Sequence, residues 1–159
     1  MRRTILTFNK PITVGMAILD VSKILMYDFH YIYMKYKYKN NLKLLYTDTN
    51  SLIYDDETED IFVDIKNNIE LKLHFDTSDY PENDMYDIPR MNKKALGKMK
   101  DESKGKFITE FAELRSKVYS YKVEGEEAAK KLKGIKKSVI DKKIQLSDYK
   151  TCLFENKEL

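Results

Sequence analysis

A short polar segment between two apolar runs holds the residues of this chain that are best suited to chemistry. Asp48 and Asn50 lie two positions apart in the string Tyr-Thr-Asp-Thr-Asn-Ser, which begins at Tyr46. Carboxylate and amide oxygens can bind Mg²⁺, a hard cation that takes few protein oxygens and shares its shell with substrate phosphates. Asn50 supplies an oxygen but no charge. The same composition is also typical of an ordinary polar turn, so both interpretations stay open.

The runs on either side are expected to form a β-hairpin that presents this segment at its tip. Residues 42–46 and 52–54 are bulky and β-compatible, and residues 47–50 supply turn chemistry between them. A hairpin tip holds a carboxylate rigidly and leaves it exposed, as a shared metal site requires.

A long helix is expected before the hairpin. Pro11 marks its start, Thr13 is the predicted N-cap, and the helix should run to about Tyr36. An apolar stripe with helical spacing follows the cap: Val14, Ala17, Ile18, Val21, Ile24 and Leu25. Because the other side of the helix is also apolar, we expect burial on more than one face.

Downstream, the pattern predicts a short helix over residues 59–67, a loop over 77–89, and strands over 106–111 and 117–123. In the second strand, alternation would place Lys117 and Tyr119 side by side on one face, where they can grip a backbone phosphate. The residues from Gly125 onward are expected to be helical, and Ser147 and Asp148 to cap a last short helix.

Lysines are concentrated late in the chain. Residues 1–80 carry a net charge of −2 and residues 81–159 a net charge of +5. The late cluster includes Lys133, Lys136 and Lys137, which fit a contact to the DNA backbone, a solvated helix face or a nuclear targeting patch. Charge alone leaves these interpretations open.

Several blocks of the chain resemble the protein-primed branch of the family B DNA polymerases. The segment 46–51 resembles the Tyr-x-Asp-Thr-Asp-Ser motif of the palm domain in that family. Residues 10–31 are similar to the helix that precedes the palm hairpin. Residues 96–102 and 110–121 resemble the block with the Lys-x-Tyr motif, and residues 131–137 match a Lys-Gly segment that follows it.

The resemblance implies an α+β fold: a polymerase palm with an antiparallel hairpin packed on helices, followed by a partial thumb. It implies a partial palm over residues 1–124 and the start of the thumb over residues 125–159. Asp48 would be the supporting carboxylate of a Mg²⁺ site. Asn50 stands where the family has an aspartate that binds the metal directly, so the site should be weakened.

The resemblance also implies function and partners. Lys117 and Tyr119 would hold the primer terminus, and the partners would be a primer-template DNA, a dNTP and a terminal priming protein. The family's other acidic palm motif, its nucleotide-binding lysine and its exonuclease region are not found in this sequence. We therefore expect a fragment of a DNA-directed DNA polymerase that is inactive alone. The alternatives are a non-catalytic DNA-binding remnant and a decayed gene fragment without function.

Length and composition fit an intracellular domain of this kind. At 159 residues, with 42% hydrophobic and 12% aromatic residues, the chain is long enough to form one domain with its own core. Its single cysteine, Cys152, excludes an internal disulfide and indicates a reducing compartment. No apolar run is long enough to span a bilayer, and the N-terminal residues 1–8 are too short for a signal peptide, so we expect no membrane partner.

Overall fold

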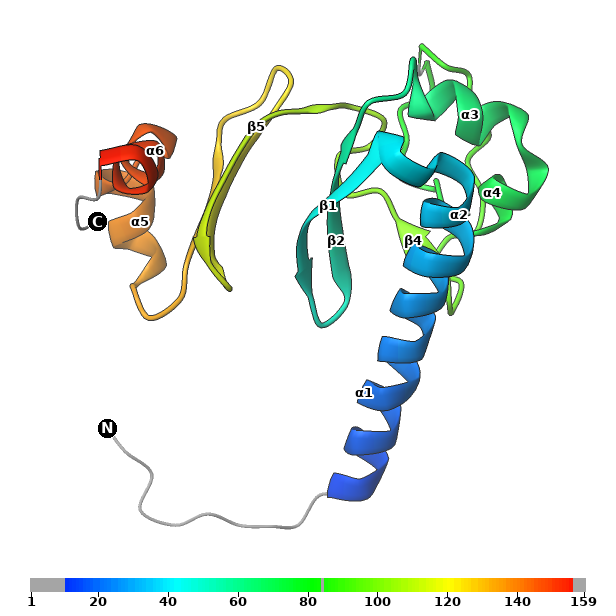
Figure 1. Ribbon diagram of the computed structural model, residues 1–159, viewed down its shortest axis with the longest axis horizontal. Helices are drawn as coiled ribbons and strands as arrows, with labels where there is room; N and C mark the ends of the chain where they lie inside the picture. Colours follow the sequence, from blue (N-terminus) through cyan, green and yellow to red (C-terminus); the bar gives the residue numbers. More distant parts are fainter. Residues whose placement is uncertain (1–10, 84, 156–159) are drawn as a thin grey trace. The chain divides into compact units, whose positions relative to one another are not determined.

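The computed structural model describes residues 11–83 and 85–155 and divides the chain into two compact units, Met1–Glu59 and Asp60–Leu159 (Figure 1). Each unit mixes helices with small antiparallel sheets, which agrees with the expected α+β class. The segment 1–8, judged too short for a signal peptide, lies outside the described residues. Among the residues that the structure describes, no helix is both long and apolar enough to cross a membrane.

The first unit begins with one continuous helical segment. It consists of α1 (Ile12–Tyr27), the π-helix η1 (Asp28–Met34), α2 (Lys35–Tyr38) and the 3₁₀ turn η2 (Lys39–Asn41). The expected long helix is confirmed, and it ends two residues beyond Tyr36. The π-helical stretch was not predicted, because hydrophobic spacing does not separate i→i+5 from i→i+4 hydrogen bonding over seven residues.

Two expectations for this helix were wrong. Pro11 occupies the N-cap position with no side-chain cap bond, and Thr13 lies inside the first turn. The apolar stripe is not covered, since its five large residues are between 39% and 65% exposed, and Met26 is the buried residue of α1. The hairpin of this unit contacts the helical segment at His30 of η1, beyond the end of α1, so it does not cover the stripe.

The predicted hairpin is present as β1 (Leu42–Asp48) and β2 (Ser51–Asp56), joined by the two-residue turn Thr49–Asn50. The register pairs Asp48 with Ser51 and shifts between Leu44 and Tyr46, so that Leu45 forms a bulge. Buried residues of the helical segment and β1 form the core of this unit: Met26, Phe29, Met34, Tyr38, Leu42 and Tyr46.

The second unit opens with two short helices and a long connection. Helix α3 (Ile61–Asn67) is capped by the Asp60 side chain, and α4 (Ile69–Leu73) by the Asn68 side chain. Strand β3 (Phe75–Asp76) pairs in parallel with β4 (Met99–Lys100). The short helix predicted after the hairpin is confirmed, and the described residues between 77 and 89 form the predicted loop.

A three-stranded antiparallel sheet covered by two helices completes this unit. Its strand order is β5 (Ile108–Arg115), β6 (Val118–Val123), β7 (Ala129–Leu132), and α5 (Lys137–Lys143) and α6 (Leu146–Glu155) follow. Tyr149 of α6 is fully buried and packs with Ala112 and Val118 from the sheet. Side chains packed around this centre enlarge the core: Leu114, Leu132, Ile144 and Leu146.

Strand β7 lies where a helix was expected. Alanine and lysine favour helices locally, but Gly125 adopts φ +72° and turns the chain back so that β7 pairs with β6. A boundary between residues 124 and 125, as expected for palm and thumb, would separate these hydrogen-bonded strands. The two compact units of the structure meet in the sequence between Glu59 and Asp60, and the assignment of residues 1–124 to a partial palm and 125–159 to a thumb stays a prediction.

Candidate functional site

The hairpin of the first unit places Asp48 at the end of β1 and Asn50 in the turn, as the sequence predicted. Asp48 is half-buried and Asn50 is exposed. One oxygen of Asp48, Oδ1, accepts a hydrogen bond of 2.8 Å from the Thr49 backbone N–H and one of 3.3 Å from the Thr49 hydroxyl. The turn therefore fixes the carboxylate from one side.

This donor set does not make a complete Mg²⁺ site. The tip offers one carboxylate, part of which already accepts bonds from Thr49, and one neutral amide. Within residues 11–83 and 85–155, no three His, Cys, Asp or Glu side chains come together as a possible metal site. Mg²⁺ in nucleotide enzymes usually needs one or two carboxylates together with substrate phosphates. Asp48 and Asn50 can contribute to such a shell but do not close it.

The hairpin is held against the helical segment through a His–Tyr pair. His30 of η1 and Tyr54 of β2 share a hydrogen bond of 3.0 Å between Nδ1 and the hydroxyl, and their rings stack 5.7 Å apart. Burial, with a smaller contribution from the positive charge of Lys35, lowers the pKa of His30. Burial raises the pKa of Tyr54. Both shifts favour the uncharged pair, which fixes the hairpin relative to η1.

Lys117 is not in a strand, so its expected place beside Tyr119 on one strand face is wrong. The register pairs Arg115 with Val118, so the chain must reverse at Ser116 and Lys117, and Lys117 adopts φ +64°. Tyr119 lies in β6 as predicted, where its ring lies 6.2 Å from the rings of Tyr121 and Phe111. Strict alternation missed the turn because no glycine or proline marks it.

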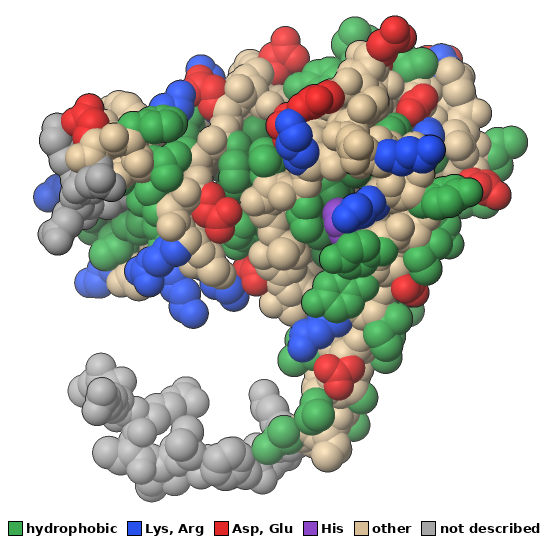
Figure 2. Space-filling model, viewed as in Figure 1, with side chains coloured by type: hydrophobic (Ala, Val, Ile, Leu, Met, Phe, Trp, Pro, Cys, Tyr) green, Lys and Arg blue, Asp and Glu red, His purple; other side chains and the backbone are tan. Residues whose placement is uncertain are grey.

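The fold does bring Lys117 together with the late lysines. The Lys133 backbone N–H donates a 3.1 Å hydrogen bond to the Lys117 carbonyl, so the turn after β5 and the turn after β7 lie side by side. We call these two segments, residues 115–117 and 133–137, the basic turn pair. Lys133, Lys136 and Lys137 are exposed. Figure 2 shows Lys and Arg side chains gathered at this end of the sheet.

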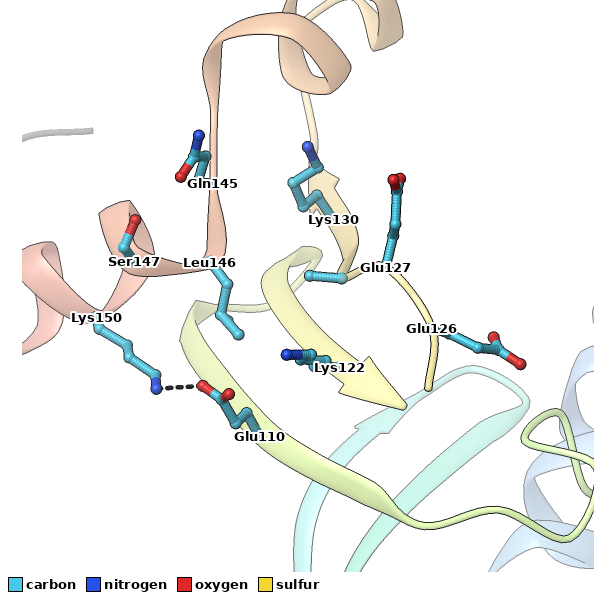
Figure 3. A pocket seen from close by; sticks show the side chains of 10 residues that line it. Glu110, Lys122, Glu126, Glu127, Lys130, Gln145, Leu146, Ser147 and Lys150 are labelled. Carbon is cyan, nitrogen blue, oxygen red and sulfur yellow. Dashed lines mark hydrogen bonds and ion pairs between the residues drawn. The ribbon is translucent and has the colours of Figure 1, made fainter. Parts of the chain in front are cut away.

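A cavity of about 570 Å³ was not anticipated from the sequence (Figure 3). Three lysines and three glutamates contribute to its lining, so these charges balance: Lys122, Lys130, Lys150, Glu110, Glu126 and Glu127. Most are already engaged. Lys150 pairs with Glu110, and the Lys130 ammonium donates a 2.8 Å bond to the Ile144 carbonyl at the end of α5. Lys130 thus holds α5 onto the sheet.

No family model, curated protein or solved structure matches this chain.

Proposed function

We propose that this chain is part of a DNA-directed DNA polymerase of the protein-primed family B type. One observation carries the proposal. The segment that resembles the palm motif of that family forms a tight two-residue hairpin, with Asp48 and Asn50 at its tip. An ordinary polar turn does not require its polar residues to lie at a rigid, exposed tip. A metal site shared with substrate phosphates does require its carboxylates there.

In this proposal Asp48 is the supporting carboxylate and Asn50 occupies the position of a direct metal ligand. Replacing a charged ligand by an amide weakens stabilisation of the charge that develops during nucleotidyl transfer, and losing one such element costs about 10²-fold or more in rate. Mg²⁺, when bound, supplies electrostatic stabilisation of the reacting phosphate. The chain by itself is therefore proposed not to extend primers.

The DNA-holding role is assigned to the second unit. The basic turn pair collects Lys117, Lys133, Lys136 and Lys137 at one end of the sheet, and Tyr119 lies on the adjoining strand β6. Lysines that neutralise phosphates give binding that weakens steeply with salt. The proposed partners are a primer-template DNA, an incoming dNTP and a terminal priming protein.

The test of this proposal is binding of the purified chain to a fluorescent primer-template duplex across a potassium chloride series. We expect salt-dependent binding that weakens in the Lys133→Gln/Lys136→Gln/Lys137→Gln variant. A matched variant, Lys23→Gln/Lys35→Gln/Lys72→Gln, removes the same charge from positions outside the basic turn pair and should bind as the native chain does. Absence of salt-dependent binding by the native chain would overturn the proposal.

The metal position has a test that does not depend on activity. Asn50→Asp adds a second carboxylate to the hairpin tip, so we expect Mg²⁺ to perturb the amide resonances of residues 48–51 at lower concentration than in the native chain. Asn50→Ser keeps the turn polar without adding charge and is the control. Equal Mg²⁺ responses of the two variants would contradict the assignment of Asn50 to a ligand position.

A second candidate is a DNA-binding module without catalysis. It is favoured by the incomplete donor set at the tip together with the collected lysines of the other unit. The two candidates differ in one outcome. In the module, Asn50→Asp leaves the Mg²⁺ response unchanged while DNA binding by the basic turn pair persists.

A further inference from the structure

The connection between β3 and β5 has nearly balanced charge as a whole, but its basic residues are concentrated in its second half, residues 90–106. We call residues 90–106 the lysine loop. It contains seven Lys or Arg and two Asp or Glu, a net charge of +5, although it includes only the two-residue strand β4. Two features of the lysine loop therefore need an explanation: what holds an irregular segment in place, and what its excess positive charge contacts.

Buried polar groups hold the loop in place. Thr77 is fully buried; its hydroxyl donates a 2.7 Å bond to the Pro89 carbonyl and accepts a 3.2 Å bond from the Met91 N–H. Asp76, also buried, accepts a 3.0 Å bond from the Lys94 N–H. At the other end, Asp101 accepts bonds of 2.8 Å from the Ser103 and Gly105 N–H groups. The backbone of the lysine loop is thus fixed from within.

Three of the seven basic side chains are neutralised by carboxylates. Arg90 pairs with Glu82 at 2.8 Å, Lys106 pairs with Glu126 at 2.8 Å, and Lys100 pairs with Asp79. The ammonium groups of the other four form no hydrogen bond or direct ion pair to any residue that the structure describes: Lys93, Lys94, Lys98 and Lys104. Lys104 is, however, attracted over a longer distance by Asp79 and Glu126. After internal pairing, four ammonium groups on one segment lack a direct carboxylate partner among the described residues.

Two of these lysines lie at backbone positions that disfavour them. Lys94 and Lys104 both have φ +55°, in the left-handed region, which costs about 1 kcal/mol or more for a residue with a Cβ. Glycine would fit both positions better. Replacing these two lysines by glycine would therefore remove charge and relieve backbone strain at the same time.

The surface fits a polyanion that can span several lysines. The cavity of about 570 Å³ in this unit is lined by residues outside the loop, so the four ammonium groups do not belong to that cavity. A membrane-binding loop would insert several large apolar side chains, whereas this one exposes a single such residue at its tip, Leu96, which is 98% exposed. A sugar-phosphate backbone carries repeated negative charges that several lysines on one segment can neutralise together.

We propose that the lysine loop is a second nucleic-acid contact, in which Lys93, Lys94, Lys98 and Lys104 bind backbone phosphates independently of base sequence. This inference rests on the proposed function, because it adds a contact of the same DNA to the one made by the basic turn pair. The two contacts lie on different elements of the second unit and can be removed separately.

The experiment is the salt series with primer-template duplex, performed on the full chain carrying Lys93→Gln/Lys94→Gln/Lys104→Gln. Each phosphate contact contributes about 0.9 to the slope of log K against log salt, so three lost contacts should lower the slope by about 2 to 3. The Lys23→Gln/Lys35→Gln/Lys72→Gln variant also lowers the net charge from +3 to zero and should retain the native slope.

A second variant guards against loss of folding. Lys94→Gly/Lys104→Gly removes two charges and relieves two left-handed backbone positions, so it should lower the slope by about 2 without lowering the free energy of unfolding.

The outcomes separate this inference from the proposed function. The inference is overturned if the loop variant keeps the native slope of log K against log salt, or if the control variant lowers that slope as much as the loop variant does. Either result leaves binding by the basic turn pair intact. Loss of binding to anionic phospholipid vesicles with unchanged DNA binding would also overturn it, in favour of a membrane surface. Absence of DNA binding by the native chain overturns the proposed function and this inference with it.

Discussion

Asn50 is the residue on which the catalytic question depends. The backbone around it is what a metal-binding hairpin needs, since a two-residue turn brings positions 48 and 50 to the same tip. The side chains at the tip do not meet the needs of a metal site, because an amide oxygen carries no formal charge and the one carboxylate is partly engaged by Thr49. The turn geometry therefore suits a metal site, whereas the uncharged side chain of Asn50 does not.

The His30–Tyr54 pair gives a pH dependence that can be measured. Burial lowers the pKa of His30 and of His74 below their ordinary value of 6.5, so near this pH the unfolded chain binds more protons than the folded chain. We therefore expect the free energy of unfolding, from urea titrations, to be highest above pH 6.5 and to fall as pH drops below it.

Two variants assign this pH dependence to its residues. His30→Gln and His74→Gln should each remove part of the fall, and the double variant should be nearly flat down to the range where carboxyl groups titrate. Burial raises the pKa of Glu113, which acts in the opposite sense in that lower range. Stability that rises on acidification from neutral pH, or a double variant that behaves as the native chain, would contradict the assignment.

At the scale of elements, local pattern was reliable where it agreed with tertiary context. The β1–β2 hairpin and helix α3 form where apolar alternation, turn residues and helical spacing predict them, and the structure adds that the Asp60 side chain caps α3. Strand β7 was missed because helix propensity is a weak preference, whereas pairing with β6 satisfies backbone groups along a whole edge. Helix α1 was found, but the prediction of its burial was not met.

The lysine loop offers a prediction about how an irregular element is ordered. Thr77→Val keeps the volume of the side chain but removes the hydroxyl that contacts Pro89 and Met91, leaving both backbone groups without their partner. We expect a loss of about 2 kcal/mol in the free energy of unfolding from urea titration. Amide exchange should also become faster over residues 89–95.

Thr109→Val is the matched control for this change. Its hydroxyl also donates to a carbonyl, that of Lys122 at 3.2 Å, but the residue is exposed and water can replace the bond. It should lose less than about 0.5 kcal/mol. An equal loss in the two variants would show that Thr77 does not organise the loop.

At the scale of the whole molecule, the division after Glu59 predicts two separate unfolding events. Tyr149 is the centre of the second unit's core, and its hydroxyl donates a 3.1 Å bond to the Lys131 carbonyl. Tyr149→Ala should destabilise that unit by about 3 kcal/mol or more. Hydrogen exchange followed by mass spectrometry should then rise in β5, β6 and β7 but stay unchanged in β1 and β2.

Tyr46→Ala is the reciprocal variant, because Tyr46 is a buried residue of the first unit. It should raise exchange in β1 and β2 and leave the sheet of the second unit protected. If either change raised exchange throughout the chain, the two units would unfold as one and the division would have no thermodynamic meaning.

The sequence by itself determined the local features of this protein. Turn residues, apolar alternation and helix caps act over a few positions, so the hairpin, the long helical segment, α3 and the loop after β3 could be predicted from nearby residues alone. The positions of Asp48 and Asn50 at the hairpin tip followed from the same local physics. The concentration of lysines late in the chain was also visible, but not which of them are free.

Only the tertiary structure decided features that depend on residues distant in the chain. Pairing of β6 with β7 brought Lys117 and Lys133 together, although sixteen positions separate them. Ion pairs with Asp79, Glu82 and Glu126 determined which basic side chains of the lysine loop are neutralised. These outcomes could not be read from the sequence, because hydrogen bonds and charge pairs form between groups that folding, not spacing, makes neighbours.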